Sequence, residues 1–147
     1  KLYHMTLDGS YINILPYSNM KKEFDSWNKK KKSIQKKEVS RFHKKREVWW
    51  CSIGINVGSE IDGRSDLFQR PVLIYKSLSR NTALIIPLTT ANYVHKYRTS
   101  IGTVGDKQAT AIISQIKVID TKRLTERIDI ISNDTYENIR KAVRNLF

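Results

Sequence analysis

Glu-Val-Trp-Trp-Cys-Ser-Ile-Gly-Ile (residues 47–55), Arg-Pro-Val-Leu-Ile-Tyr (70–75) and Ala-Leu-Ile-Ile-Pro-Leu-Thr-Thr (83–90) are the three runs that decide the fold. Each run is short and rich in Val, Ile, Leu and aromatic residues, and polar or glycine-containing links separate the runs. Apolar runs of this kind predict β-strands, here over Val48–Ile55, Pro71–Leu78 and Thr82–Leu88.

The C-terminal part of the chain continues the strand pattern and ends in a helical one. Further strands are predicted over residues 94–104, Ala109–Ile113, Ile116–Ile119 and Arg127–Ile131. Residues 134–147 predict an amphipathic helix, with Asp134 and Glu137 at the spacing of a capping box. The apolar face of this helix consists of Tyr136, Ile139, Val143 and Leu146. Many short strands closed by one helix predict a fold that is mainly β with helices, a small β-barrel.

The N-terminal part has a different pattern. Residues 10–17 are expected to form a loop. Residues 19–37 predict a helix that Ser18 or Asn19 caps, with Glu23 in its first turn, where the helix dipole favours a carboxylate.

This predicted helix has two distinct faces. A narrow stripe at helical spacing consists of Met20, Phe24, Trp27, Lys31 and Ile34. Much of the rest is basic, with Lys29, Lys30, Lys31, Lys32, Lys36 and Lys37. We expect the stripe to dock on the barrel, with a partner helix as the alternative. The lysines are either a solubilising face or an extension of a surface that binds polyanions.

Positive charge is the strongest global signal. The chain carries 27 Lys and Arg against 14 Asp and Glu, a formal net charge of +13. Residues 1–46 hold 13 basic and 4 acidic side chains, and residues 47–147 hold 14 and 10. Such a balance favours polyanionic partners, although a well-solvated surface is the alternative. It does not indicate any particular chemistry.

A single cysteine, Cys51, excludes an internal disulfide and a cysteine-based zinc site. It lies in an apolar run and is expected to be a buried, unreactive thiol. The sequence lacks an apolar run of the length that a membrane helix needs. A cytoplasmic protein with no membrane partner is therefore expected.

The order and spacing of two blocks carry a family resemblance. The first is the stretch already quoted, with Arg70 next to Pro71 and the pair Thr89-Thr90, and the second is Ser-Gln-Ile-Lys-Val-Ile-Asp-Thr-Lys-Arg-Leu at residues 114–124. Together they resemble the MazF/PemK family of toxin ribonucleases from bacterial toxin–antitoxin pairs. The resemblance covers residues 46–147 and implies an SH3-like small barrel of the MazF, Kid and CcdB type. Residues 1–45 lie outside it and form an N-terminal extension with one basic helix.

The resemblance implies that Arg70 and Thr89 are catalytic. A ribonuclease without a metal ion uses the 2′-hydroxyl of the RNA as nucleophile, and an Arg fork suits the charge that develops on the phosphate. A hydroxyl at a strand end can donate to a phosphate oxygen. The alternatives are a surface Arg and a Thr that merely favours strands. Because side chains alternate along a strand, only one of Thr89 and Thr90 is expected to point into the site.

Further residues are implied as RNA contacts: Gly58, Ser59, Glu60, Gln69, Thr90, Gln115 and Lys117. Glu60 can accept from a base edge or orient Arg70, and a plain turn is the alternative for Gly58-Ser59-Glu60. The loop 61–69 is longer than in the family, and Leu67 or Phe68 in it can stack on a base or pack on the barrel.

Other positions limit the mechanism. An acidic side chain and an Arg of the PemK-type branch are replaced here by Ser114 and Ile112, which cannot do acid–base work. The chain therefore resembles the MazF-type branch. His95 is of the residue type that most often acts as a base, but no motif supports this role for it.

The resemblance as a whole implies a toxin that is a metal-independent, sequence-specific endoribonuclease without a cofactor. It cuts single-stranded RNA and leaves a 2′,3′-cyclic phosphate. It also implies a homodimer and an acidic antitoxin protein, whose charge suits a chain of +13. Two alternatives stay open: a non-catalytic gyrase poison like the CcdB relatives, and an RNA-binding module that does not cut.

Overall fold

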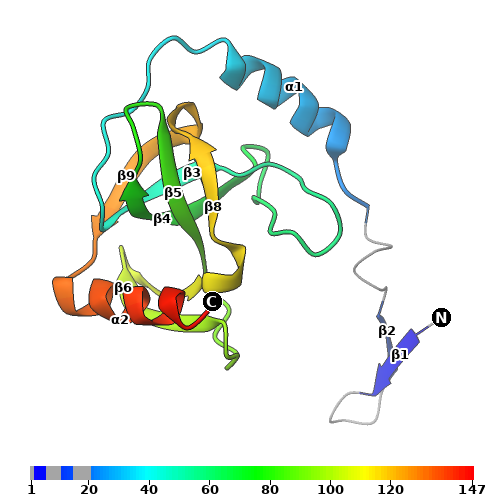
Figure 1. Ribbon diagram of the computed structural model, residues 1–147. Coiled ribbons are helices and arrows are strands. Elements are labelled where there is room, and N and C mark those ends of the chain that lie inside the picture. Colours follow the sequence, from blue (N-terminus) through cyan, green and yellow to red (C-terminus); the bar gives the residue numbers. More distant parts are fainter. Residues whose placement is uncertain (1, 6–10, 15–20) are drawn as a thin grey trace.

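A curled antiparallel sheet forms the body of the protein in the computed structural model, which describes residues 2–5, 11–14 and 21–147 (Figure 1). Its strands are β3 (Glu47–Ser52), β4 (Gln69–Ser77), β5 (Thr82–Thr89), β6 (Arg98–Val104), β7 (Lys107–Ile112), β8 (Lys117–Asp120) and β9 (Leu124–Ile130). The strand order along the main path is β6-β7-β5-β4-β3-β9. β8 lies off this path and pairs with the first half of β5, whereas β7 pairs with the end of β5. The sheet is thus a half-barrel, which confirms the predicted fold class.

The central strands are buried on both faces, which explains their continuous apolar sequences. Val48, Leu73 and Ile86 pack on one side in a cluster that includes the C-terminal helix. Cys51 and Ile74 pack on the other side in a second cluster. Burial raises the pKa of the Cys51 thiol to about 12, so the predicted inert cysteine is confirmed as a fully buried one.

The two ends of the curled sheet approach each other at the β6–β7 turn. The Gly105 amide donates to the Asp129 carboxylate of β9 over 3.0 Å. Gly105 has a φ of +60° in this tight hairpin turn, a conformation that glycine adopts at low cost because it has no side chain. Gly105 also lines the cavity described below.

The strand boundaries differ from the predicted ones where the backbone turns. β3 ends at Ser52 rather than Ile55, because Gly54 has a φ of +88° that a strand cannot contain. The strand predicted to end at Ile113 gives way to a 3₁₀ turn, η2 (Ile113–Gln115). A second such turn, η3 (Thr121–Arg123), follows β8.

The C-terminal helix, α2 (Asn133–Arg144), packs its predicted apolar face on the half-barrel. Ser132 caps it by accepting from the Thr135 amide over 3.2 Å, so the capping box predicted at Asp134 is wrong. The cap lies two residues earlier because the helix begins earlier. Tyr136 on this helix donates its hydroxyl to the Tyr75 carbonyl over 2.7 Å, which ties α2 to β4.

The N-terminal part holds two short strands and one helix. β1 (Leu2–Met5) pairs antiparallel with β2 (Tyr11–Ile14), so the loop predicted over residues 10–17 is wrong for Tyr11–Ile14. A partner strand supplies the hydrogen bonds that local sequence could not foresee. The helix, α1 (Phe24–Gln35), is shorter than predicted and begins after Glu23, which occupies the cap position. The predicted caps Ser18 and Asn19, like Met20 of the stripe and the rest of the loop over 10–17, lie outside the described residues.

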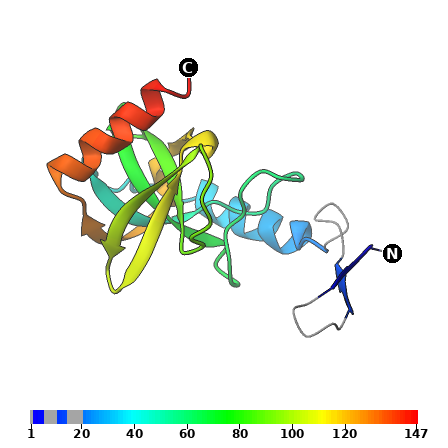
Figure 2. The ribbon, with the colours of Figure 1, turned by 90° about the horizontal axis from the view of Figure 1, so that it is seen from below.

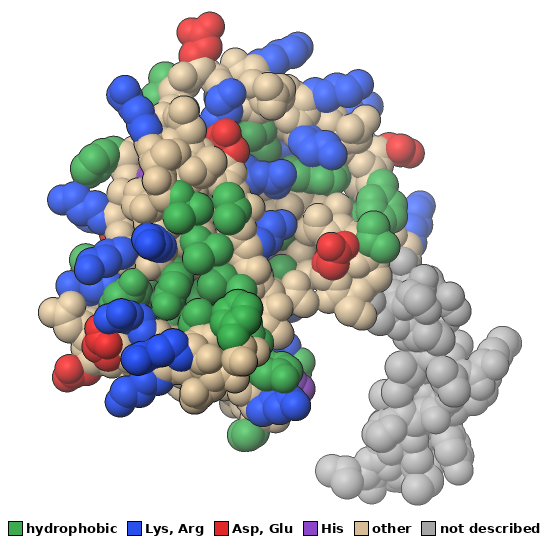
Figure 3. All heavy atoms as spheres, viewed as in Figure 1, with side chains coloured by type: hydrophobic (Ala, Val, Ile, Leu, Met, Phe, Trp, Pro, Cys, Tyr) green, Lys and Arg blue, Asp and Glu red, His purple; other side chains and the backbone are tan. Residues whose placement is uncertain are grey.

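The helix α1 docks on the half-barrel, at the opposite end from α2 (Figures 1 and 2). Trp27 and Ile34 are buried and pack against Phe68, with the Trp27 and Phe68 ring centroids 5.6 Å apart. This confirms the predicted docking of the stripe for those two residues, whereas Phe24 is half exposed. The basic side chains of α1 face outward, and Lys and Arg gather over this end of the molecule (Figure 3).

In the part of the chain that the structure describes, no helix has the length and apolar character required to cross a membrane.

Candidate functional site

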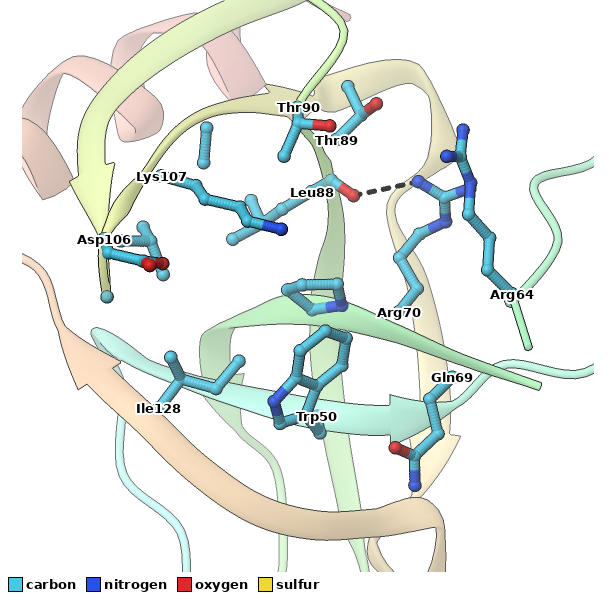
Figure 4. Close-up of a pocket in the computed structure, with 14 residues that line it drawn as sticks. Trp50, Arg64, Gln69, Arg70, Leu88, Thr89, Thr90, Asp106, Lys107 and Ile128 are labelled. Carbon is cyan, nitrogen blue, oxygen red and sulfur yellow. Dashed lines mark hydrogen bonds between the residues drawn. The ribbon is translucent and has the colours of Figure 1, made fainter. Parts of the chain in front are cut away.

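A cavity of about 430 Å³ opens between the start of β4, the end of β5 and the β6–β7 turn, with β3 and β9 beneath it (Figure 4). Four of the residues singled out from the sequence line this cavity together: Gln69, Arg70, Thr89 and Thr90. The fold thus brings the two predicted catalytic residues into one cavity.

Arg70 is held by two main-chain carbonyls. Its Nε donates to the Asp62 carbonyl over 2.7 Å, and its Nη1 donates to the Leu88 carbonyl over 3.1 Å. The side chain is 92% buried, and yet it forms part of the cavity wall. Two main-chain acceptors on different segments fix the plane of the guanidinium.

The register of β4 and β5 leads towards Arg70 and Thr89. β4 and β5 pair with Val72 opposite Pro87, and continuing this register by two residues places Arg70 opposite Thr89. Opposite residues on antiparallel strands project from the same face. The bond from Arg70 to Leu88, the residue before Thr89, holds this arrangement.

Thr89 and Thr90 both contribute to the lining of the cavity. β5 ends at Thr89, so Thr90 lies just beyond the strand. The two hydroxyls differ in environment. Thr89 is buried and its Oγ1 accepts from the Ala91 amide over 3.1 Å, which orients the oxygen while its own proton can still be donated. Thr90 is exposed.

The charge of the cavity is largely positive. Besides Arg70, the side chains of Arg64 and Lys107 line it, and Asp106 is the acidic residue among its described lining residues. Figure 4 shows the Lys107 amine directed into the cavity and Arg64 reaching towards its Arg70 end. This arrangement suits an anion such as a phosphodiester.

Arg64 and Lys107 were not predicted from the sequence as site residues. Arg64 lies in the long loop, where a short ladder fixes its backbone: its amide donates to the Gln69 carbonyl over 2.8 Å, and the Gln69 amide returns the bond over 3.0 Å. Lys107 is the first residue of β7, directly after the β6–β7 turn, and this turn reaches the cavity through the curl of the sheet. A basic residue beside a tight hairpin turn is the one signal that the sequence offered.

Trp50 provides an aromatic wall. It lies on β3, is 37% exposed and lines the cavity (Figure 4). Its neighbour Trp49 points to the other face, where it is buried and donates its indole N–H to the Glu47 carboxylate over 2.8 Å. An exposed indole beside basic groups can stack on a nucleobase.

Three other predicted residues line a separate hollow of about 210 Å³: Glu60, Gln115 and Lys117. The Glu60 carboxylate accepts from the Val57 amide over 2.9 Å, and the acceptor that holds Arg70 on this loop is the Asp62 carbonyl. The Gln115 amide group bridges the loop through the Ile61 amide and the Ser59 carbonyl, each over 3.3 Å. Gln115 therefore supports the loop that Glu60 belongs to.

Gly58 and Ser59 form the exposed tip of this loop, where Gly58 has a φ of +56°. Phe68, which was open between stacking on a base and packing, is buried against α1. His95 lies outside the cavity and accepts from the Tyr97 amide over 3.2 Å.

Among the residues that the structure describes, no cluster of three or more His, Cys, Asp or Glu side chains is arranged to hold a metal ion.

Comparison with known proteins places this geometry in a family context. Residues 44–147 match the family described as "PemK-like, MazF-like toxin of type II toxin-antitoxin system". No curated protein sequence was found to match the chain.

Solved structures share the fold at low sequence identity. A MazF from Deinococcus radiodurans (Form-I) superposes with a TM-score of 0.61 at 14% identity, covering 72% of this chain and 96% of that one. An endoribonuclease in complex with its cognate antitoxin, from Mycobacterial species, gives 0.56 at 15%, covering 71% and 93%. A MazE–MazF structure (Form-II) from Deinococcus radiodurans gives 0.56 at 13%, covering 72% and 95%.

Proposed function

Because the chain belongs to the PemK-like, MazF-like family of toxins of type II toxin–antitoxin systems, we propose that it is an endoribonuclease that cuts single-stranded RNA without a metal ion or cofactor. The observation that carries the proposal is that Arg70 and Thr89 line the same cationic cavity. The structures named above share its fold, and one of them is described as an endoribonuclease.

The proposed reaction uses the RNA itself as nucleophile. The ribose 2′-oxygen attacks the adjacent phosphorus and loses its proton, and the bond from phosphorus to the 5′-oxygen breaks. The 5′-oxygen takes up a proton, so the products carry a 2′,3′-cyclic phosphate and a 5′-hydroxyl. Negative charge builds on the phosphate oxygens in the transition state, and the fixed Arg70 guanidinium is placed to stabilise it.

The other lining residues have supporting roles in this proposal. The Thr89 hydroxyl donates to a phosphate oxygen, and Arg64 and Lys107 attract the phosphates on either side of the cleaved bond. Trp50 offers its exposed face for stacking on an unpaired base, which favours a single strand over a duplex. Gln69 and Thr90 contact the RNA at the cavity, and Glu60 and Lys117 contact it along the adjoining hollow. Gly58, Ser59 and Gln115 shape the loop between the two.

The proposed partners follow from the family and the charge. One relative of the same fold is a complex with its cognate antitoxin, and another is a MazE–MazF structure. We therefore propose an acidic antitoxin for this chain, whose net charge of +13 favours it. We also propose a cytoplasmic homodimer.

The lysines of α1 extend the basic surface beyond the cavity. Partial burial is the main cause that lowers the pKa of Lys37, which follows α1, and repulsion by the positive charges of Lys30 and Arg41 contributes less. This basic surface continues from α1 onto η3, where the Lys122 amine donates to the Gln35 carbonyl over 3.4 Å. A polyanion relieves such repulsion, so this face strengthens RNA binding.

Replacing Arg70 by Ala should lower the rate of RNA cleavage by about 10²–10³-fold, because a fixed electrostatic stabiliser of the transition state is lost. Single-turnover cleavage of a labelled RNA measures the rate. Arg140→Ala, which removes an exposed Arg from α2, is the matched control and should leave the rate unchanged. Wild-type cleavage by a folded Arg70→Ala protein would contradict the assignment.

Thr89→Ala should slow cleavage more than Thr90→Ala does. Thr89 is buried, its hydroxyl is oriented by the Ala91 amide and it lines the cavity with Arg70, whereas Thr90 is exposed beyond the end of the strand. The same kinetic assay on the two variants, with melting temperatures to confirm folding, compares them. Equal effects of the two substitutions, or a larger effect of Thr90→Ala, would contradict the catalytic role proposed for Thr89.

Cleavage of a single-stranded RNA by the purified protein should persist in EDTA and yield 2′,3′-cyclic phosphate ends, because the proposed reaction needs no metal ion. Mass spectrometry of the products identifies the ends, and gyrase activity measured in parallel detects a gyrase poison. Cleavage that stops in EDTA and returns with a divalent ion contradicts the mechanism. Binding without cleavage would indicate an RNA-binding module.

The double variant Lys29→Gln/Lys32→Gln on α1 should weaken RNA binding and flatten its salt dependence, by about 0.7 in the log–log slope for each phosphate that the variant no longer neutralises. Lys141→Gln/Arg144→Gln removes the same charge from exposed positions of α2 and is the control. Substituting the charges is a more specific test than deleting α1, because the deletion would also remove the packing of Trp27 on the β3–β4 loop. Equal effects of the two double variants would mean that net charge alone matters.

A further inference from the structure

Lys22, the residue two positions before α1, reaches into the loop that joins β3 to β4. Its amine donates to the Asn56 carbonyl over 2.7 Å and to the Gly58 carbonyl over 2.9 Å. It also forms an ion pair with the Asp62 carboxylate at 3.1 Å. One ammonium group thus joins three points of the loop that are spread over seven residues.

The environment of Lys22 distinguishes it from a surface lysine. Its side chain is 11% exposed, and that of Asp62 is 18% exposed. The preceding residue, Lys21, lies 3.9 Å from Glu23 with the two side chains 90% and 60% exposed, a pair that contributes little. The Lys22 contact is shielded from solvent and charge-assisted, so it constrains the loop more strongly.

Asp62 passes this constraint on to Arg70. Its carboxylate accepts from the Asn56 amide over 2.7 Å in addition to the Lys22 ion pair, which fixes the Asp62 side chain at two points. Its carbonyl accepts from Arg70 Nε over 2.7 Å. A continuous path therefore runs from the Lys22 amine through Asp62 to the guanidinium in the cavity.

A second contact from α1 secures the base of the same loop. Trp27 packs so closely on Gly54 that a Cβ atom there would lie 2.1 Å from its ring. Gly54 in turn donates to the Phe68 carbonyl over 3.1 Å, and Gly63 donates to the Gly54 carbonyl over 2.8 Å. The loop is therefore anchored at its base by Trp27 and across its length by Lys22.

We propose that Lys22 is a positioning residue for the reaction: it locks the β3–β4 loop and, through Asp62, holds Arg70 in its working position. The proposal rests on the proposed function for its kinetic part. The family match begins at residue 44, so this residue comes from outside the matched region. An N-terminal extension thereby completes the support of a site that the barrel carries.

The test compares Lys22→Met, which keeps the apolar stem and removes the charge, with Lys21→Met, which removes the same charge next to it. Lys22→Met should lower kcat by roughly 10- to 100-fold with little change in KM, because small displacements of a catalytic group have effects of this size. Lys21→Met should leave kcat unchanged. Lys22→Arg restores the charge and should recover part of the loss.

Two further measurements test directly whether Lys22 holds the β3–β4 loop and Arg70, and neither requires cleavage. Hydrogen exchange at the Asn56 amide should be faster in Lys22→Met than in the wild type or in Lys21→Met. The Arg70 Nε–H signal in ¹⁵N NMR should also exchange faster with solvent. Thermal melting confirms that each variant is folded, and Lys22→Arg serves as the folded comparison if Lys22→Met is not.

Each outcome is decisive. An unchanged kcat for Lys22→Met, an equal loss for Lys21→Met, or unchanged exchange at Asn56 and Arg70 overturns the proposal. A loss confined to KM would mean that Lys22 only attracts RNA, which also overturns it. If the wild type does not cut RNA, the proposed function fails, and the exchange measurements alone decide whether Lys22 holds the loop and Arg70.

Discussion

The two main-chain carbonyls that accept from Arg70 are the constraint on which the site depends. One belongs to Leu88 at the end of β5, and the other belongs to Asp62 in the β3–β4 loop. A buried guanidinium needs acceptors, and here they come from two parts of the fold that the sheet and the loop hold independently. The same bonds therefore align the strand that carries Thr89 and fix the loop against it. Such a site is preorganised, because the guanidinium is already held in its position before a ligand binds.

The loop between β3 and β4 separates two hollows of the surface. It divides the residues implied by the family resemblance into a deep cavity around Arg70 and a shallower hollow around Lys117. Gln115 supports it from the barrel side, and Lys22 and Trp27 support it from the extension side. The loop is thus held by contacts on both of its sides.

The fold was predictable from sequence where local pattern and tertiary environment agree. The apolar runs of β3, β4 and β5 are buried on both faces, and their sequences have the continuous hydrophobicity that this requires. Ends of elements were less predictable, because Gly54 and the Ser132 cap depend on single backbone conformations. Arg70 and Thr89 were found through their motif. Arg64 and Lys107 were not, since the curl of the sheet, which local sequence does not encode, brings the β6–β7 turn over the cavity. Phe68 shows the same limit, because its partner Trp27 is about forty residues away in the chain.

The contact of Trp27 with Gly54 limits what position 54 can hold. A side chain there would collide with the indole, and the left-handed backbone disfavours other residues as well. Gly63 is restricted for a different reason, because a Cβ atom there would meet the Phe68 carbonyl of the loop itself. Any residue larger than glycine at position 54 would therefore push the Trp27 ring away, and α1 would lose its seat at the base of the loop.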